Sequence, residues 1–272
     1  MKEFKQFLLD LSYSEIKNIF AKHLLWSKGN GRVSGTPKWF DEPDTLNVIG
    51  FDCDSNSFAA DNEIEFNLGR YKDFLMLIYN NPSGSYDQVI IEVTLDPETD
   101  KYGRMNLMPG VYDAYRVGIH GLSTGLTTVY VPEKNETYMR YALRQDRAKV
   151  YVARTDGSNK SKVIKYEWSM SYSNIHNPGK SAGCTVTKTN KDWFEKLLPY
   201  LVDIDTIRSK NVKIRPANHN KITYCVMNHK QLELYANEVI ERPKLAKAVD
   251  PAIDYTDPGA VVAGKAVKEG GQ

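Results

Sequence analysis

The sequence predicts a β-rich α+β protein with flanking helices and a flexible C-terminal tail. Short apolar, β-prone runs separated by Gly, Pro, Asn and Asp recur from residue 46 to residue 131. The N-terminal residues instead repeat apolar side chains at helical spacing. From about residue 242 the composition changes to Pro, Ala, Gly, Lys and Asp, which bury too little apolar surface to order a chain.

The N-terminal region is predicted to be a helical stretch followed by a loop. Apolar residues recur at helical spacing over residues 4–11, and the pattern continues to Leu24. Ser12 or Ser14 is expected to cap a second helix within this stretch. Residues 27–45 are rich in Gly, Pro, Ser and charge, and they are predicted to form a loop.

Strands dominate the middle of the chain. The segment 80–84, Asn-Asn-Pro-Ser-Gly, is typical of a hairpin loop between two apolar runs. Residues 133–147 are polar and charged, which indicates an exposed insertion or a short helix. The predicted strands are 46–51, 74–79, 88–94, 115–120, 126–131, 148–154 and 221–227.

Two further helices are predicted near the C-terminus. Asn190 is expected to cap a helix over residues 191–202, and a second helix is expected over residues 231–241. The buried face of the first is predicted to be Trp193, Leu197, Leu198 and Leu201. We therefore divide the chain into a helical region with a loop (1–45), a β-rich domain (46–241) and a tail (242–272).

Composition narrows the classes of function. The formal net charge of the 272 residues is only +2, so no strong field for nucleic acid is expected. No apolar run is long enough to span a bilayer, and the N-terminus lacks the features of a secretory signal. The three cysteines are far apart and include no CxxC pair, so neither a disulfide framework nor a zinc site is expected.

Residues 175–186 combine a candidate nucleophile, a candidate base and a flexible backbone. A thiol becomes a good nucleophile as thiolate, and a nearby histidine such as His176 can accept the proton of Cys184. Gly183 allows a substrate to approach the backbone, and Ser181 adds a hydroxyl donor. The N–H groups around Gly183 and Cys184 are candidates for stabilising an oxyanion. The alternative is that Cys184 is a small buried hydrophobic residue.

Other residues with reactive or metal-binding side chains are weaker candidates for a functional site. His120 and Gly121 lie where a predicted strand ends in a glycine-rich turn, so they are candidates for lining the same site. A half-exposed hairpin histidine is the alternative interpretation. The carboxylates of residues 52, 54 and 61 lack the glycine and distal glutamate of a calcium loop, so a solvated turn is favoured. Cys53 and Cys225 have no neighbouring base, and core packing explains them better.

His176 and the following Ser181-Ala-Gly-Cys184 element resemble the signature of the L,D-transpeptidase (YkuD-like) catalytic domain. The order of motifs is also similar to phage-encoded relatives, over roughly residues 45–228. The segments that carry this likeness are Pro109-Gly-Val-Tyr112, residues 115–121, Asn174-Ile-His176 and residues 181–184. Val186, two residues after the cysteine, stands where many cellular members carry Arg or Asn.

The resemblance implies a role for each matching residue. Cys184 would be the nucleophile and His176 the general base. Gly183 and Cys184 would supply oxyanion-hole amides, and Ser181 would support the loop. His120 and Gly121 would contribute to substrate binding. The implied substrate is bacterial peptidoglycan, and the implied chemistry requires no metal or organic cofactor.

The resemblance implies a phage-associated, cysteine-dependent peptidoglycan-processing enzyme. It would cleave a stem peptide through a thioester acyl-enzyme, with hydrolysis favoured over transpeptidation. The lack of a signal is consistent with synthesis in a bacterial host cytoplasm and packing into a virion or release at lysis. The alternative is a structural tail or hub protein with a non-catalytic copy of the domain and a partner-binding segment at 242–272. A cytoplasmic peptidase acting on proteins is a third interpretation.

Overall fold

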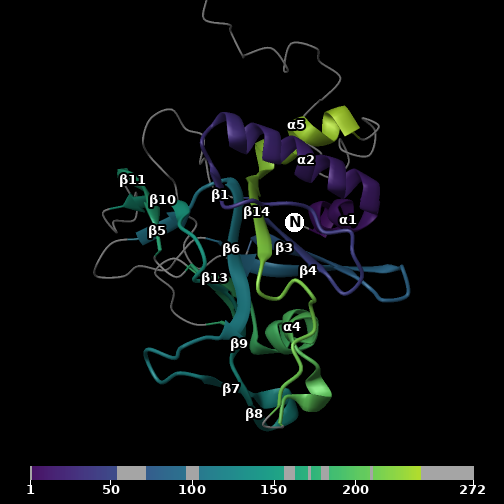
Figure 1. The fold of residues 1–272 in the computed structure, drawn as a ribbon, viewed down its shortest axis with the longest axis vertical. Coiled ribbons are helices and arrows are strands. Elements are labelled where there is room, and N and C mark those ends of the chain that lie inside the picture. The colour runs from purple at the N-terminus through teal and green to yellow at the C-terminus, as the bar shows by residue number, and fades with distance from the viewer. Residues whose placement is uncertain are drawn as a thin grey trace, which may run out of the picture.

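The structure is a computed structural model, and it describes residues 2–53, 72–95, 104–155, 163–170, 173–178, 184–208 and 211–239. Within these residues the chain forms a closed, mixed β-barrel of eight strands with helices packed against it (Figure 1). The expectation of a β-rich fold with a few helices is therefore confirmed. Of the predicted division into three parts, the tail 242–272 lies outside the described residues, and the boundaries at 45 and 241 stay predictions.

Around the ring the strands are β6 (Gly110–Ile119), β14 (Ile222–Asn228), β2 (Leu46–Asp52), β3 (Asp73–Asn80), β4 (Tyr86–Thr94), β13 (Thr185–Thr187), β12 (Ile175–His176) and β9 (Tyr141–Gln145). The barrel is closed because β9 pairs with both β12 and β6. Within the ring, β14 is parallel to β2 and β12 is parallel to β13. All other neighbouring strands of the ring pair antiparallel. A short strand β1 (Val33–Ser34) adds to β6 outside the ring.

Side chains alternate between two apolar cores, because successive residues of a strand point to opposite faces. In β2, Leu46 and Val48 belong to the core cluster inside the barrel. Ile49 and Phe51 of the same strand belong to a second cluster, which lies between the barrel wall and helices. Both faces of β2 and β3 are therefore buried, as their nearly continuous apolar sequences require.

The helices α1 (Lys2–Asp10), α2 (Tyr13–Gly29) and α5 (His229–Val239) cover that outer face. Ser12 forms a capping box with Glu15 at the start of α2, which confirms the expected cap. The helical pattern continues five residues beyond the predicted end at Leu24. The last helix begins two residues before its predicted start.

The helical segment after β13 contributes to the barrel interior. It comprises α3 (Asn190–Asp192), a π-helical turn η2 (Trp193–Leu197) and α4 (Leu198–Leu201), followed by η3 (Ile204–Thr206). The four residues predicted to be its buried face are buried in the interior cluster, as expected. The predicted N-cap was wrong by one residue: Thr189, not Asn190, is extended and accepts the Asp192 N–H.

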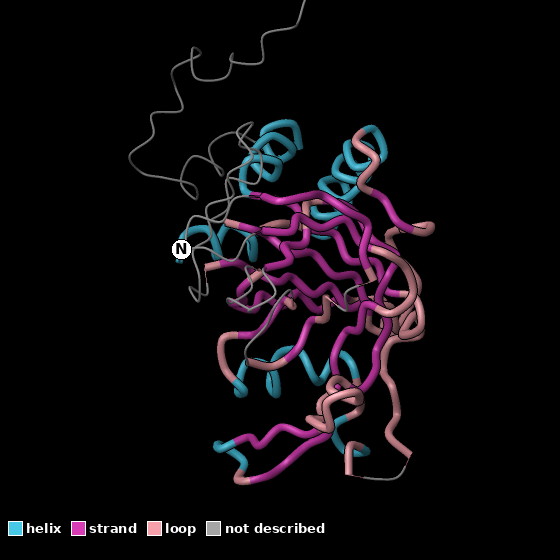
Figure 2. The backbone as a smooth tube through the Cα atoms, turned by 90° about the vertical axis from the view of Figure 1, so that its left-hand side faces the viewer, coloured by secondary structure: helices cyan, strands magenta, loops and turns pink. Residues whose placement is uncertain are grey.

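The charged stretch 133–147 is the main error in the predicted elements. After the turn η1 (Pro132–Lys134), it forms β8 (Glu136–Met139) and the barrel strand β9. The charge of this stretch misled the prediction, because the one charged residue of β9, Arg144, lies on the outer face, whereas Tyr141 and Leu143 point into the core. The strand β7 (Thr128–Val131) pairs with β8 as a projecting hairpin, which lies at the bottom of Figure 2.

A separate three-stranded sheet lies beside the barrel, at the left of Figure 1. Its strands are β5 (Arg104–Leu107), β10 (Val150–Thr155) and β11 (Val163–Ser169), in the order β11-β10-β5. Among the described residues, no helix is long and apolar enough to cross a membrane.

Candidate active site

The parallel pair β12–β13 brings the candidate nucleophile and base together. Ile175 is opposite Thr185, His176 is opposite Val186, and the Thr185 N–H donates to the Asn174 carbonyl at 2.9 Å. Cys184 therefore enters the pair one residue before the register begins, beside Asn174. Neighbouring strands lie about 4.8 Å apart with a rise of about 3.3 Å per residue, which puts the Cα atoms of His176 and Cys184 about 8 Å apart.

The same register puts the His176 side chain on the outer face of the barrel. Ile175 belongs to the interior core, and the Thr185 hydroxyl lies 3.3 Å from the Tyr224 hydroxyl inside the barrel. Because strand side chains alternate, His176 points the other way. Cys184 lies just before β13 and interacts electrostatically with both Arg140 and the buried Tyr115. The lengths of an imidazole and a thiol side chain together can close a gap of about 8 Å between their Cα atoms.

The strands β6 and β9 extend this outer face with a second histidine and two arginines. His120, at the end of β6, stacks on His176 with ring centroids 4.2 Å apart. Its Nδ1 lies 3.1 Å from the Asn174 amide nitrogen. Arg140 precedes β9 and Arg144 lies within it, and both act electrostatically on His120. The structure thus brings His120 directly onto His176.

His176 is held by two polar neighbours at its Nδ1 atom. The Asn177 carbonyl oxygen lies 2.6 Å away, and the Arg140 Nη2 lies 3.1 Å away. A carbonyl can only accept, whereas a guanidinium can only donate, so one tautomer cannot satisfy both. The shorter contact assigns the proton to Nδ1, which donates to the carbonyl. The Nε2 atom then keeps its lone pair and can accept a proton.

Both histidines are neutral at pH 7. Burial is the main reason that the pKa of His120 falls to about 4, and the charges of Arg140 and Arg144 lower it further. His176 is only 2% exposed. Burial again lowers its pKa well below the usual value, with added effects of His120 and Arg140, although hydrogen bonds with Asn177 oppose the shift. Two neutral rings can stack without charge repulsion.

Arg140 is the site residue that sequence reasoning missed. Its Nε donates to the Asn177 side-chain oxygen, its backbone N–H donates to Thr127, and its carbonyl accepts from His120. Burial lowers the pKa of Arg140, and electrostatic interaction with Cys184 raises it. A positive charge that interacts electrostatically with a thiol favours its thiolate form. A lone arginine in a charged stretch gave no signal of this role.

Gly121 shapes the turn that follows His120. Its φ of 80° lies in the left-handed region, and a Cβ there would collide with the Leu126 backbone carbonyl. Only glycine fits this turn without strain. The turn also brings the Leu126 carbonyl to 3.5 Å from the Arg140 Nη1. Gly121 therefore has a structural part in positioning both His120 and Arg140.

The remaining predicted site residues lie elsewhere or outside the described part of the chain. Ser181 and Gly183 lie outside it, as do Asp54 and Asp61. Within the described ranges, no group of three or more His, Cys, Asp or Glu could hold a metal ion. Cys225 is fully buried, as expected, and Cys53 is half-buried.

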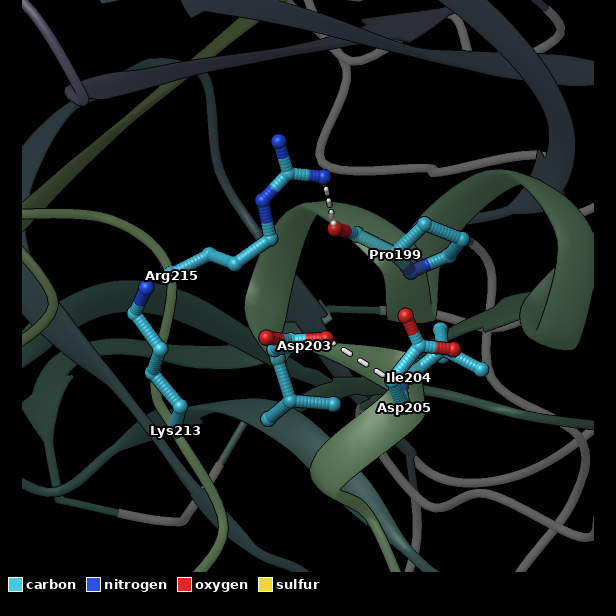
Figure 3. Close-up of a pocket in the computed structure, with 7 residues that line it drawn as sticks. Pro199, Asp203, Ile204, Asp205, Lys213 and Arg215 are labelled. Atoms are coloured by element: carbon cyan, nitrogen blue, oxygen red, sulfur yellow. Dashed lines mark hydrogen bonds between the residues drawn. The ribbon is translucent and has the colours of Figure 1, made fainter.

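A charged cavity of about 420 Å³ lies apart from these residues, beside α4 and η3 (Figure 3). Asp203 and Asp205 face it from one side, and Lys213 and Arg215 face it from the other. Arg215 is held by a 2.9 Å hydrogen bond to the Pro199 carbonyl. None of the predicted site residues lines this cavity.

Comparison with known proteins gives no independent indication of function. No protein-family model, no curated protein and no solved structure matches the chain.

Proposed function

We propose that the protein is a cysteine-dependent peptidoglycan-processing enzyme of the L,D-transpeptidase-like kind. The observation that carries the proposal is the β12–β13 register, from which the Cα atoms of Cys184 and His176 are about 8 Å apart. The resemblance of residues 174–184 to that family supplies the substrate class, a peptide of the bacterial wall. The β-rich fold is compatible with this assignment.

The chemistry begins with transfer of the Cys184 proton to His176 Nε2. The thiolate then attacks a stem-peptide carbonyl, forming a C–S bond and a tetrahedral oxyanion. Collapse breaks the C–N bond, and His176 returns its proton to the departing amine. The resulting thioester is hydrolysed when His176 takes a proton from water, or it is passed to an amine acceptor. We favour hydrolysis.

Arg140 and the stacked His120 fit this scheme as positioning residues. The Asn177 carbonyl holds the Nδ1–H of His176, so Nε2 is the basic atom. Arg140 binds the Asn177 side chain and supplies a fixed positive charge near Cys184. A cation beside a thiol favours the thiolate. His120 covers one face of the His176 ring and limits its rotation.

The burial of His176 favours a second candidate function. A ring that is 2% exposed and that resists protonation is a poor general base for a bound substrate. This observation supports a non-catalytic copy of the domain that binds the wall or a structural partner. The two candidates differ in whether Cys184 is needed for covalent chemistry.

The test is digestion of purified peptidoglycan by the protein beside Cys184→Ala. The enzyme proposal expects soluble muropeptides from the wild type and none from the variant, because the thiol forms the acyl bond. Cys53→Ala is the matched control, since Cys53 is also half-buried but lies outside the site. It should release muropeptides at the wild-type rate.

Mass spectrometry of the intact protein gives an independent readout. A trapped thioester adds the mass of the acyl fragment to the wild type and to Cys53→Ala, but not to Cys184→Ala. Equal release by wild type and Cys184→Ala would contradict a cysteine mechanism. If all three proteins bind peptidoglycan, keep the same near-UV circular dichroism and release nothing, the non-catalytic function is correct.

A further inference from the structure

A second cavity, of about 270 Å³, lies at the base of α2 and the tip of the β3–β4 hairpin. This volume is near the lower end for small-molecule sites, which span about 300–1,000 Å³. It has room for one or two small rings but not for a large cofactor. Tyr13 and Tyr86 form its aromatic wall, with ring centroids 4.9 Å apart.

The aromatic wall is rigid and partly open. Tyr86 is 39% exposed, so part of its ring is available to a ligand. Two hydrogen bonds hold the Tyr13 hydroxyl in place. Trp39 Nε1 donates to it at 2.9 Å, and it donates to Asp41 at 3.0 Å. Trp39 also packs against the Tyr13 ring with centroids 5.7 Å apart. The wall is therefore held in place before any ligand arrives.

The rest of the cavity lining is polar and carries short side chains. Asn80, Asn81 and Ser85 line it together with Asp41. The Asn81 amide donates to Ser85 at 3.2 Å and to Asp87 at 3.1 Å, which leaves the Asn81 side-chain oxygen to accept from a ligand. Amide, carboxylate and hydroxyl groups are suited to the hydroxyls of a neutral ligand.

We propose that this cavity binds a pyranose saccharide. A sugar ring has an apolar C–H face that packs on an aromatic ring and an edge of hydroxyls that needs donors and acceptors. Tyr13 and Tyr86 supply the first requirement, and Asn81, Ser85 and Asp41 supply the second. The lining of the cavity is the basis for proposing a saccharide as the ligand. The more specific proposal, that the ligand is an N-acetylhexosamine polymer, rests on the proposed function.

The cavity is remote from the candidate active site. Tyr86 begins β4, and Thr94, eight residues later, pairs with Val186 of β13. At about 3.3 Å per residue this strand separates the two sites by about 26 Å. In Figure 1 the β3–β4 hairpin extends to the right, away from β13. A saccharide site at this distance would anchor the protein to a glycan polymer and raise the effective concentration of nearby peptides.

The test is titration of the full chain, in the Cys184→Ala form, with chitotetraose and with cellotetraose. Cys184→Ala separates this inference from the proposed function, because binding then needs no catalysis. NMR detection of the indole N–H signals, assigned with Trp39→Phe, reports on the cavity through the Trp39–Tyr13 hydrogen bond. We expect chitotetraose to shift the Trp39 signal and to leave the signal of the buried Trp193 in place.

Variants locate the binding. Tyr86→Ala should weaken binding about tenfold, and Tyr86→Phe, which keeps the ring, should retain it. Tyr130→Ala is the matched control, because Tyr130 is an exposed tyrosine on the β7–β8 hairpin. Absence of any Trp39 shift with both sugars would overturn the inference, as would equal binding by Tyr86→Ala. Binding of cellotetraose alone would overturn the wall-glycan assignment.

Discussion

His23 offers a quantitative test of how the outer helices are attached to the barrel. The ring is fully buried between α2, β14 and α5. Its Nε2 lies 2.7 Å from the Val226 carbonyl, and its Nδ1 lies 3.2 Å from the Tyr235 hydroxyl. Burial lowers the pKa of His23 to about 4, although hydrogen bonds to the carbonyls of Val226 and Gly110 oppose the shift.

The sign of the pH effect follows from this depressed pKa. An unfolded histidine titrates near pH 6.5, so between about pH 6.5 and pH 4 the unfolded chain binds a proton that folded His23 does not. The contribution of neutral His23 is present above pH 6.5 and is lost as the pH falls toward 4. With these two pKa values, moving from about pH 7.5 to about pH 5 lowers the unfolding free energy by about 2 kcal/mol.

The assay is urea unfolding of the wild type and His23→Gln at a series of pH values, followed by tryptophan fluorescence. Glutamine can still donate to the Val226 carbonyl but does not titrate, so the wild type should lose about 2 kcal/mol more than the variant over this pH range. Tyr235→Phe removes only a neutral partner, so it should keep the wild-type pH dependence. Parallel curves for the wild type and His23→Gln would refute the reasoning.

Three further predictions concern the N-cap of α2, the turn at Gly121 and the candidate active site. Ser12→Ala removes the capping box of α2 and should lower the urea-unfolding free energy by about 1 kcal/mol, whereas Ser14→Ala should cost less. Gly121→Ala should destabilise the fold by more than about 1 kcal/mol in thermal melts, because φ is positive and the Leu126 carbonyl blocks the Cβ. Arg140→Gln should slow alkylation of Cys184 by iodoacetamide about tenfold at neutral pH, with Arg154→Gln as the unaffected control.

Sequence patterns located most of the elements because their signals are local. The apolar runs of β2 and β3, the Asn-Pro-Ser-Gly loop after Asn80 and the Trp193 helix face all occur within short windows. Closure of the barrel could not be predicted in this way. It depends on β14 pairing in parallel with β2, about 170 residues earlier, and on β9, whose outward Arg144 disguised an inward apolar pattern.

For a related reason, only part of the candidate site could be predicted from the sequence. Cys184 and His176 are rare residue types close together in sequence, so their chemistry drew attention to residues 175–186. Arg140 lies 44 residues before the cysteine in a stretch where charge usually means solvent exposure. Only the pairing of β9 with β12 and β6 places it beside the histidines. Its function depends on tertiary position rather than on a local motif.

The charges of the site suggest how the thiolate is stabilised in the proposed mechanism. Burial and the charge of Arg140 disfavour a charged imidazole at both His120 and His176, so a thiolate–imidazolium pair would be costly. Arg140 stays charged at any working pH, so its guanidinium can stabilise the thiolate in place of an imidazolium. Arg140, which lies between β8 and β9, would supply this cation from outside the β12–β13 pair. In that arrangement His176 transfers protons, and Arg140 stabilises the negative charge of the Cys184 thiolate.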